Sequence, residues 1–467
     1  MTQMIELSTP DLRPLAAALM GEVLTPESAG YQEARQVWNG AVDLHPAAIV
    51  RPLQAQDVAE AVRFARRHAL PVAVRSGGHS PAGFGTVEGG LVIDLSQMTG
   101  LTVDPATRRV QVEPGLTWGE VADALQPHGL AITAGDTPTV GVGGLTQGGG
   151  IGWFVRKHGL AVDRLRAVDL VTAEGELLRA SADEHPELFW GVRGGGANFG
   201  IITRYEFEAH PGGTVLGGIV IFDGTDARRL LGEYARIAAA APDELSTQAL
   251  LFAAPPLPFI PAEAVGQPLF AVSMCYSGDP EAGEAVLAPL RQLAPSILDL
   301  VAPMPYSGIL KLPLYAQAGE HGFRHFVRSQ FVQQVDDAFL DALVGGVTEV
   351  FSPGTGIQLR VLGGELARIP AGSTAFSHRD KAALLMISHM VPLDVPAEAA
   401  APAAQATETI FAATRPHAAG TYGNFLSVGE EGRVGEVFSA AALDRLAALK
   451  RQLDPHNMFA RNANVRP

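Results

Sequence analysis

Three clusters of consecutive glycines constrain the fold of this chain more than any other feature of its sequence. They occupy residues 75–80, 141–152 and 193–200. Glycine adopts positive φ and lets backbones approach closely, so each cluster is suited to a tight turn between a helix and a sheet. Consecutive glycines also let several backbone N–H groups converge on an anion. A single cluster favours the turn, whereas three close together favour a large ligand that carries phosphate.

The patterns of the common nucleotide-binding loops are missing from these clusters. Neither Gly-x-Gly-x-x-Gly nor the Walker A motif occurs in them, which argues against a conventional NAD or nucleoside-triphosphate site. A metal centre is not expected either. The chain has one cysteine, Cys275, and no His-Glu-x-x-His or similar spacing.

Length and charge narrow the classes of function. With 467 residues and 47% hydrophobic content, the chain is long enough for two domains. Its net charge of -15 opposes binding to nucleic acid or to an anionic membrane. Residues 1–20 lack the charged and apolar regions of a signal peptide, and no apolar run is long enough to span a membrane. We therefore expect a cytoplasmic protein without nucleic-acid or membrane partners; its oligomeric state is open.

Hydrophobic periodicity predicts alternating helices and strands up to about residue 212. Capping boxes are expected at residues 57–60, with Asp57 as N-cap, and at residues 117–120, where a helix begins that ends near Gly129. Val58, Ala61, Val62 and Ala65 share one helical face. Strands are predicted at 70–74, 91–95, 110–112 and 201–207, with a hairpin over 167–180 that turns at Glu174-Gly175.

The pattern changes at His210–Gly213, where a second domain is expected to begin. No repeat of fixed period is present. The remaining predictions are helices at 280–293, 337–347 and 440–453, strands at 357–362 and 382–389, and proline-rich loops at 255–261 and 396–402.

Several long motifs resemble the FAD-linked oxidases of the vanillyl-alcohol oxidase superfamily, and its berberine-bridge-enzyme-like branch in particular. PVAVRSGGHS at 71–80 is similar to the pyrophosphate loop of that family, and residues 90–96 are similar to the strand that follows it. TPTVGVGGLTQGGGIG at 137–152, residues 157–163 and LFWGVRGGGANFGII at 188–202 are similar to further flavin-domain motifs. YGNF at 422–425 and DPHNMF at 454–459 are similar to its C-terminal segment.

The resemblance implies an α+β fold. It predicts a two-subdomain FAD-binding domain of the PCMH type over residues 1–212. A substrate domain with an antiparallel sheet backed by helices is expected over 213–419. Residues 420–467 would form a C-terminal segment that returns to the FAD-binding domain.

The same resemblance implies the cofactor and its attachment. FAD would be bonded through one covalent link to His79, the histidine of Arg75-Ser76-Gly77-Gly78-His79. Many relatives have a second link from a cysteine just before the Pro-x-Val-Gly stretch, and Thr137 stands at that position here. The chain therefore resembles the members with one bond, such as hydroxynicotine oxidases, and bulky oligosaccharide substrates are not favoured. From the residues alone, His79 is more simply a turn residue.

Tyr422 is the candidate catalytic base. A tyrosine that works as a phenolate near neutral pH needs its pKa lowered by about three units, and Arg324, Arg360, His325 and His378 are unplaced candidates for a cation that could do this. Packing against the flavin is the equally weighted alternative role. The residues that the resemblance implies for FAD binding are Val74, Arg75, Ser76, Gly77, Gly78, His79, Ser80, Gly83, Thr137, Val140, Gly141, Gly143, Gly144, Gly148, Gly149, Gly150, Gly152, Gly200, Ile201, Ile202, Asn424 and Phe425.

The implied function is oxidation of a small organic molecule, an alcohol, sugar or amine, by hydride transfer to FAD with molecular oxygen as acceptor. Two alternatives stay open: a dehydrogenase with another electron acceptor, and a flavin- or ligand-binding protein without turnover. The substrate cannot be read from the sequence because the middle of the chain resembles the family only loosely.

Overall fold

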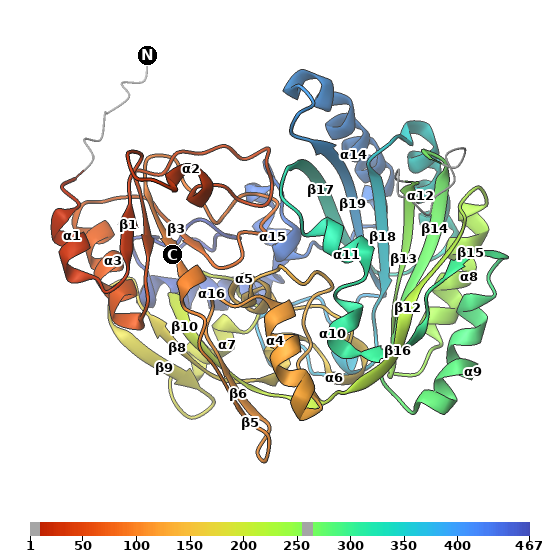
Figure 1. Cartoon of the computed structure of the whole chain (residues 1–467), viewed down its shortest axis with the longest axis horizontal. Helices are drawn as coiled ribbons and strands as arrows, with labels where there is room; N and C mark the ends of the chain where they lie inside the picture. Colours follow the sequence, from red (N-terminus) through yellow and green to blue (C-terminus); the bar gives the residue numbers. More distant parts are fainter. Residues whose placement is uncertain (1–9, 255–264) are drawn as a thin grey trace.

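A small, mainly parallel sheet lies near the N-terminal end of the chain (Figure 1). The computed structural model describes residues 10–254 and 265–467. The strands lie in the order β1 (Glu22–Leu24), β2 (Ala48–Arg51), β4 (Leu91–Asp94), β3 (Val72–Arg75). Helix α3 (Ala55–Arg67) connects the parallel strands β2 and β3, as such a crossover requires. The predicted apolar face of α3 is confirmed, because its four members are fully buried. Two short helices complete this layer: α1 (Arg13–Ala18) and α2 (Tyr31–Ala34).

The prediction of Asp57 as an N-cap is wrong. Helix α3 begins three residues earlier than predicted, with Gln54 in the extended N-cap conformation. Asp57 lies in the first turn and is buried. It accepts hydrogen bonds from the backbone N–H groups of Leu53 (3.0 Å), Gly21 (3.0 Å) and Met20 (3.2 Å). The carboxylate therefore satisfies N–H groups of a distant segment as well as its own helix, which a local sequence pattern does not reveal.

A second sheet is entirely antiparallel and lies beside the first. Its order is β5 (Leu101–Asp104), β6 (Arg109–Val112), β10 (Ile201–Glu208), β8 (Leu165–Val171), β9 (Leu177–Ser181). The predicted hairpin is confirmed, since β8 and β9 pair directly. Helix α4 (Trp118–Leu125) has the predicted capping box between Thr117 and Glu120, and Gly129 closes the 3-10 turn that follows it. The other helices here are α5 (Val142–Gln147), α6 (Val155–His158) and α7 (Pro186–Val192).

The middle of the chain forms one large antiparallel sheet with helices on its outer face (Figure 1). Its strand order is β15 (Ser296–Asp299), β12 (Thr214–Asp223), β14 (Pro268–Tyr276), β13 (Leu245–Ala253), β18 (Thr355–Val361), β19 (Ala383–Pro392), β17 (Phe323–Val332), and β16 (Ala302–Pro305) also pairs with β12. The outer helices are α8 (Ala227–Ala239), α9 (Pro280–Arg291), α12 (Asp337–Val350) and α14 (Ala401–Thr414). Shorter helices are α10 (Tyr306–Ile309), α11 (Pro313–Ala318) and α13 (Glu365–Arg368). The predicted α+β fold class is confirmed.

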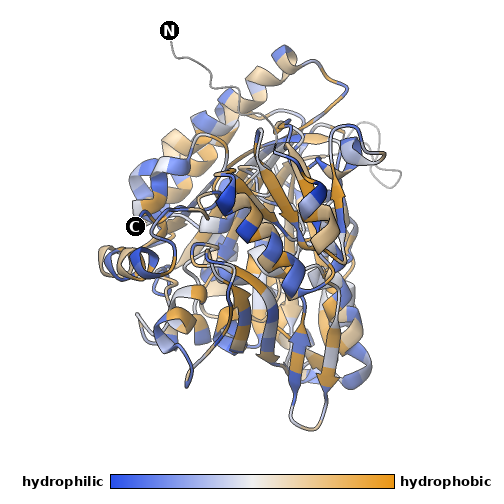
Figure 2. Cartoon of the chain, turned by 90° about the vertical axis from the view of Figure 1, so that its left-hand side faces the viewer, coloured by the Kyte–Doolittle hydropathy of each residue, from blue (hydrophilic) through white to orange (hydrophobic). Residues whose placement is uncertain are grey.

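Hydrophobic packing joins the helices to this sheet. Tyr234 of α8 and Phe339 of α12 are fully buried among strand residues such as Phe270 and Leu359. Figure 2 views the molecule from the side of the small sheet, and the helices seen there show both blue and orange segments, as expected for elements with one face in the core and one in water.

One proline-rich loop prediction is wrong. Residues 396–402 are not a loop, because a 3-10 turn over Ala397–Ala400 leads directly into α14. Pro402 sits in the first turn of α14, where its missing N–H would have no partner in any case. The other predicted loop, 255–261, lies outside the described residues.

The C-terminal segment packs against the second sheet. Helix α16 (Ala440–Leu453) has the predicted bounds. Leu446 and Leu449 belong to the same core as Val110 of β6 and Tyr205 of β10. Short helix α15 (Val434–Val437) precedes α16. The C-terminal segment, which follows the large sheet in the sequence, thus packs on the first half of the chain. The exact domain boundaries at residues 212 and 419 stay predictions. In the described part of the chain, no helix is long and apolar enough to cross a membrane.

Two stacked histidines lie where the first half of the chain meets the large sheet. The rings of His158 at the end of α6 and His210 in β11 (His210–Pro211), which pairs with β7 (Leu130–Ala131), are 3.6 Å apart. Burial lowers the pKa of His158 to about 4 and that of His210 to about 2, with Arg164 contributing to both. Both rings are therefore neutral at neutral pH.

The histidine pair should make the protein sensitive to acid. Because the folded pKa values lie below the ordinary value of 6.5, the unfolded chain binds more protons between about pH 6.5 and 4, and stability falls as the pH drops through that window. In urea titrations, His210→Phe should reduce the loss of unfolding free energy between about pH 7 and pH 5 by about 1–2 kcal/mol. The exposed His456, changed to Phe, is the matched control. Equal pH dependence in the His210→Phe variant and the wild type would contradict this.

Candidate functional site

A cavity lies between the glycine clusters and the large sheet, and the C-terminal segment borders it as well. Most of the predicted site residues line it. They are Val74, Arg75, Ser76, Gly77, Gly78, His79, Ser80, Thr137, Val140, Gly141, Gly143, Gly144, Gly148, Gly200, Ile201, Ile202, Tyr422, Asn424 and Phe425. The fold thus gathers segments that are far apart in the sequence into one site.

Four predicted contact residues do not border this cavity, and they serve packing instead. Gly83, Gly149, Gly150 and Gly152 have no room for a side chain because other parts of the protein press against them. A Cβ on Gly152, for example, would lie 1.5 Å from the carbonyl oxygen of Ala134.

The first two glycine clusters touch each other through their backbones. A Cβ on Gly77 would lie 2.4 Å from the nitrogen of Gly141, and a Cβ on Gly141 would lie 2.2 Å from the nitrogen of Gly77. The hydroxyl of Ser76 fixes this contact, because it donates to the carbonyl of Pro114 (2.5 Å) and accepts from the N–H of Gly143 (3.2 Å). The two loops therefore form one continuous surface of backbone along the cavity.

The side chain of Arg75 is used inside the protein. Its guanidinium donates to the carboxylate of Asp94 (2.8 Å) and to the carbonyls of Ala34 (2.5 Å) and Gln36 (3.2 Å). Arg75 can therefore offer a ligand its backbone and its positive charge, while its hydrogen bonds hold the loop in place.

His79 faces the cavity at the end of the first glycine cluster. Burial lowers the pKa of His79 to about 4, with His321 as a further cause, so the imidazole is neutral at neutral pH. Its ring stacks on Trp38 with centroids 5.5 Å apart. Within the described residues, neither ring nitrogen has a hydrogen-bond partner. The ring is thus oriented by an aromatic contact, while its nitrogens are available to a ligand. Thr137 also lines the cavity, and its hydroxyl donates to Asp136 (3.2 Å).

Tyr422 is buried at the border of the same cavity. Its oxygen accepts hydrogen bonds from the backbone N–H of Gly150 (3.1 Å) and from the amide of Asn424 (2.9 Å). Burial raises the pKa of Tyr422, whereas these two donors, the N–H of Ile151 and the charge of Arg360 act in the opposite direction. Among the described residues its own hydroxyl proton has no acceptor, which leaves that proton for a ligand in the cavity.

The segment that carries Tyr422 is attached to strand β17. The N–H of Phe331 donates to the carbonyl of Gly420 (2.9 Å), and the N–H of Ala419 donates to the carbonyl of Phe331 (2.7 Å). The hydroxyl of Thr421 donates to the carbonyl of Ser329 (3.1 Å). The residue before Tyr422 is therefore fixed on the large sheet.

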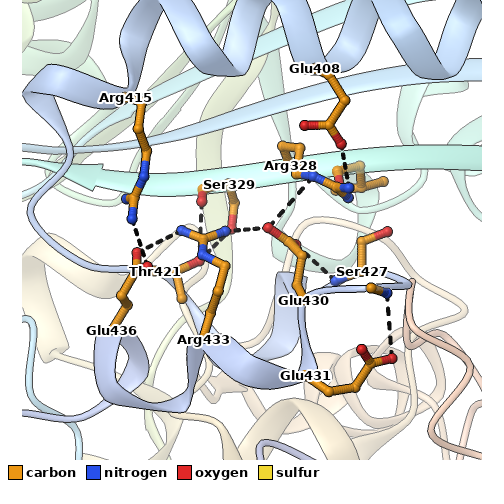
Figure 3. A network of polar contacts seen from close by, with 12 residues as sticks. Arg328, Ser329, Glu408, Arg415, Thr421, Ser427, Glu430, Glu431, Arg433 and Glu436 are labelled. Carbon is orange, nitrogen blue, oxygen red and sulfur yellow. Dashed lines mark hydrogen bonds and ion pairs between the residues drawn. The ribbon is translucent and has the colours of Figure 1, made fainter.

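A network of charged side chains supports the attachment of the Tyr422 segment to β17 (Figure 3). Glu430 is buried, contacts Arg433 and lies 3.6 Å from Arg328 of β17. Glu436 accepts from Arg433 (2.8 Å) and from Arg415 (2.6 Å). Since the network links β17, the end of α14 and the C-terminal segment, it fixes the position from which Tyr422 enters the cavity.

Strands of the large sheet form a wall of the cavity that the sequence did not reveal. Alternate residues of β19 face it, while Leu385 and Ile387 between them face the core. The lining residues from this side are Tyr315, Ala318, His325, Val327, Gln358, Arg360, Leu384, Met386, Ser388 and Met390. The sequence of residues 383–390 predicts a strand, whose alternate side chains face opposite sides of the sheet. Nothing in the sequence indicates which of the two faces meets a ligand.

One cation among the four candidates lies at the cavity near Tyr422. Arg360 donates to Asp136 (2.6 Å), to Gln248 (3.0 Å) and to the carbonyl of Ile151 (3.3 Å). Tyr315 donates to the same oxygen of Gln248 (3.1 Å). The charge of Arg360 is thus partly balanced by Asp136, and the arginine is held rigidly.

The other three candidates do not supply a cation to Tyr422. Arg324 donates to the carbonyls of Pro392 and Val395 and does not line the cavity. The ring of His378 stacks on that of Phe331, and its Nε2 lies 2.9 Å from each of two backbone carbonyls. His325 does line the cavity, but burial lowers its pKa to about 3, so its ring is neutral.

The cavity suits a long ligand that carries phosphate, such as FAD. The charged side chains among its described lining residues are Arg75, Arg360 and Arg461 against Asp136, which favours an anion. Gly144 lines the cavity, and no atom of the described residues lies within 4 Å of the place where its Cβ would be. This open space, together with exposed backbone from three glycine clusters, is what a closely bound dinucleotide requires. Among the described residues, no group of three metal-ligating side chains occurs.

Comparison with known proteins identifies two family domains in the chain. Residues 46–181 match the FAD binding domain family, and residues 421–466 match the berberine and berberine-like family. These two ranges contain the first two glycine clusters and the Tyr422 motif, respectively.

Relatives match over almost the whole chain. The (R)-6-hydroxynicotine oxidase of Paenarthrobacter nicotinovorans is 30% identical over 457 residues, which is 96% of this chain and 97% of the relative. The crystal structure of 6-hydroxy-D-nicotine oxidase from Arthrobacter nicotinovorans has a TM-score of 0.84 at 28% identity and covers 100% of both chains. The xylooligosaccharide oxidase of Myceliophthora thermophila, in complex with xylobiose, has a TM-score of 0.83 at 25% identity, with 97% of this chain and 98% of that chain covered.

The space beside Gly144 gives a direct test of the bound cofactor. Gly144→Ala places a methyl group in the cavity, whereas the helical backbone of α5 accepts alanine readily. We expect FAD affinity to fall at least about tenfold, which is about 1.4 kcal/mol, without loss of stability in the protein free of FAD. FAD content per chain and the melting temperature measure the two effects.

Gly345→Ala is the matched control. Gly345 is also a helical glycine, in α12, and a Cβ there would likewise meet nothing within 4 Å among the described residues, but it does not line the cavity. The control should retain full FAD content. If Gly144→Ala retained it too, the ligand would not lie beside α5.

Proposed function

The chain belongs to the berberine bridge enzyme-like family of FAD-linked oxidoreductases, and from that premise we propose that it oxidises a small organic substrate with FAD bonded to His79 and with molecular oxygen as electron acceptor. The observation that carries the proposal is the placement of His79, Tyr422 and the glycine clusters around one cavity. Relatives named for nicotine and for xylooligosaccharides indicate that members of the family oxidise different small molecules.

The glycine clusters would hold the cofactor. Backbone N–H groups of residues 75–79 are suited to the pyrophosphate because they border the cavity next to the charge of Arg75. Gly141, Gly143, Gly144 and Gly148 would follow the flavin and ribityl chain, and Gly200 with Ile201 would contact the adenine side. When bound, FAD supplies the redox chemistry, since its flavin ring accepts a hydride.

His79 is suited to a covalent bond with the cofactor. Its imidazole is neutral, faces the cavity and has no hydrogen-bond partner for either nitrogen within the described residues. Formation of the bond removes one hydrogen from a methyl group of the flavin and one from the imidazole. Dioxygen would take up the two electrons together with these two protons, which gives hydrogen peroxide. Thr137 stands where relatives with two bonds have a cysteine, so one bond is proposed.

Tyr422 would receive or position the proton that leaves the substrate. Burial is the largest effect and raises the pKa of Tyr422, whereas the donors Gly150 and Asn424 and the charge of Arg360 favour the phenolate. Since the two donors occupy both lone pairs of the neutral hydroxyl, the substrate would meet Tyr422 through the hydroxyl proton, or through the additional lone pair of the phenolate. The positive charge of Arg360, which is held rigidly near Tyr422, is the feature of the site that favours a role for Tyr422 as a base over a role in packing alone.

The covalent bond can be tested by denaturation. The yellow colour of the wild type should remain with the protein after acid precipitation, because a covalent bond survives unfolding. The His79→Ala variant should bind FAD and release all of it into the supernatant. Free FAD from the wild type would contradict the bond, and colour that stays on the His79→Ala chain would show that another residue is linked.

The role of Tyr422 can be tested by a substitution that removes only its hydroxyl group. Tyr422→Phe keeps the ring and should slow anaerobic reduction of the flavin by about 10²–10⁴-fold, the usual value of general-base assistance. In the wild type the rate should rise with pH through one ionisation that the variant lacks. Stopped-flow measurements at several pH values, with a substrate found by screening for peroxide release in air, provide the data. A change of less than about threefold would assign Tyr422 to packing.

A further inference from the structure

Residues 38–40 connect the His79 loop to the large sheet, and we call them the Trp38–Gly40 bridge. The N–H of Trp38 donates to the carbonyl of Gly78 (3.2 Å), directly before His79. The N–H of Gly40 donates to the carbonyl of Phe323 (2.8 Å) in β17. One short segment near the start of the chain thus contacts both sides of the cavity.

The side chain of Asn39 forms the centre of the bridge. It is fully buried, and its amide donates to the carbonyls of Pro81 (2.7 Å) and His325 (3.1 Å). Its oxygen accepts from the N–H groups of His325 (2.9 Å) and Ala41 (3.1 Å). An amide has two donor hydrogens and two acceptor sites, so every hydrogen bond of Asn39 is satisfied. Buried and fully bonded, it fixes the spacing between the His79 loop and β17.

Two histidine rings stack on Trp38. Its centroid is 5.5 Å from that of His79, with the planes 26° apart, and 3.6 Å from that of His325, with the planes 19° apart. The indole N–H donates to the carbonyl of Ala318 (3.0 Å), the last residue of α11, which sets the direction of the ring. His325 is buried, so one of the two rings that stack on Trp38 is itself held in the protein interior.

Among the described residues, the stack on Trp38 is the one aromatic contact of the His79 ring, and the ring makes no hydrogen bond there. His79 follows two glycines, whose backbones are the most permissive of all residues. Its ring has no hydrogen bond, and a hydrogen bond to a nitrogen would occupy the atom that must form the new bond. Stacking holds the plane of the ring and leaves both nitrogens free.

We infer that Trp38 is a positioning residue for the covalent attachment of FAD: it holds the imidazole of His79 in the orientation in which a ring nitrogen meets the flavin methyl group. This inference rests on the proposed linkage at His79. Orientation matters because a bond forms efficiently only when the reacting atoms are already held close together and aligned. His325 and Asn39 act through Trp38 by holding it against the loop.

The test compares two replacements of Trp38. Trp38→Phe retains an aromatic face for His79, whereas Trp38→Met retains bulk without one. Each protein is purified, total bound FAD is measured from the absorbance of the native sample, and the covalent fraction is measured from the colour that remains after acid precipitation. The time course of attachment is followed after FAD is added to protein freed of the unattached cofactor.

We expect equal total FAD in both variants, near-complete attachment in Trp38→Phe, and attachment about tenfold slower in Trp38→Met. A role in stability alone would lower total FAD and leave the covalent fraction of the bound flavin unchanged. Wild-type rates of attachment in Trp38→Met would overturn the inference.

Two further results distinguish failure of the proposed His79 linkage from failure of the positioning role of Trp38. If the wild type itself releases its FAD, the proposed linkage is wrong, and the positioning role of Trp38 is wrong with it. If Trp38→Met binds too little FAD to score, His325→Leu decides, because it removes a ring that stacks on Trp38 while the side chains of Trp38 and His79 stay unchanged. Slower attachment in His325→Leu supports the stack, and an unchanged rate overturns it.

Discussion

The contact between Gly77 and Gly141 is the constraint on which the rest of the site depends. Neither residue can have a side chain, because the Cβ of each would overlap the backbone nitrogen of the other. The contact brings the loop after β3 against the start of α5, and the hydroxyl of Ser76 locks the two together. Once these loops are joined, the backbone along one side of the cavity is fixed, and so is the point from which His79 projects.

Local signals in the sequence were sufficient for much of the fold. The capping box at Thr117, the hairpin turn at Gly175 and the bounds of α16 follow from short-range chemistry, and the structure has all three. The errors arose where distant partners decide. Asp57 caps backbone of another segment, and Pro402 begins a helix that packs on β17 and β19.

The candidate site was predictable in its glycine loops and unpredictable in its opposite wall. The motifs around His79 and Tyr422 could be found because they are long and contiguous. Trp38 and Asp136 could not be found, and His325 and Arg360 were named only as unplaced candidates for a cation, because the role of each depends on contacts with residues far away in the sequence. Long-range proximity also determines the acid–base state of Tyr422, whose donor Gly150 is 272 residues away.

Strand β17 holds both chemical groups of the site, although it contains neither. At one end, Phe323 and His325 contact the Trp38–Gly40 bridge and through it the His79 loop. Further along, Ser329 and Phe331 hold the segment that leads to Tyr422.

Since an extended strand rises about 3.3 Å per residue, the four residues from His325 to Ser329 separate the two attachment points by about 13 Å along β17. Val327, midway between them, lines the cavity. The large sheet is therefore more than a wall for the substrate. It sets the distance between the histidine proposed to bind the cofactor and the tyrosine proposed to handle the proton, and a shift of β17 would move both.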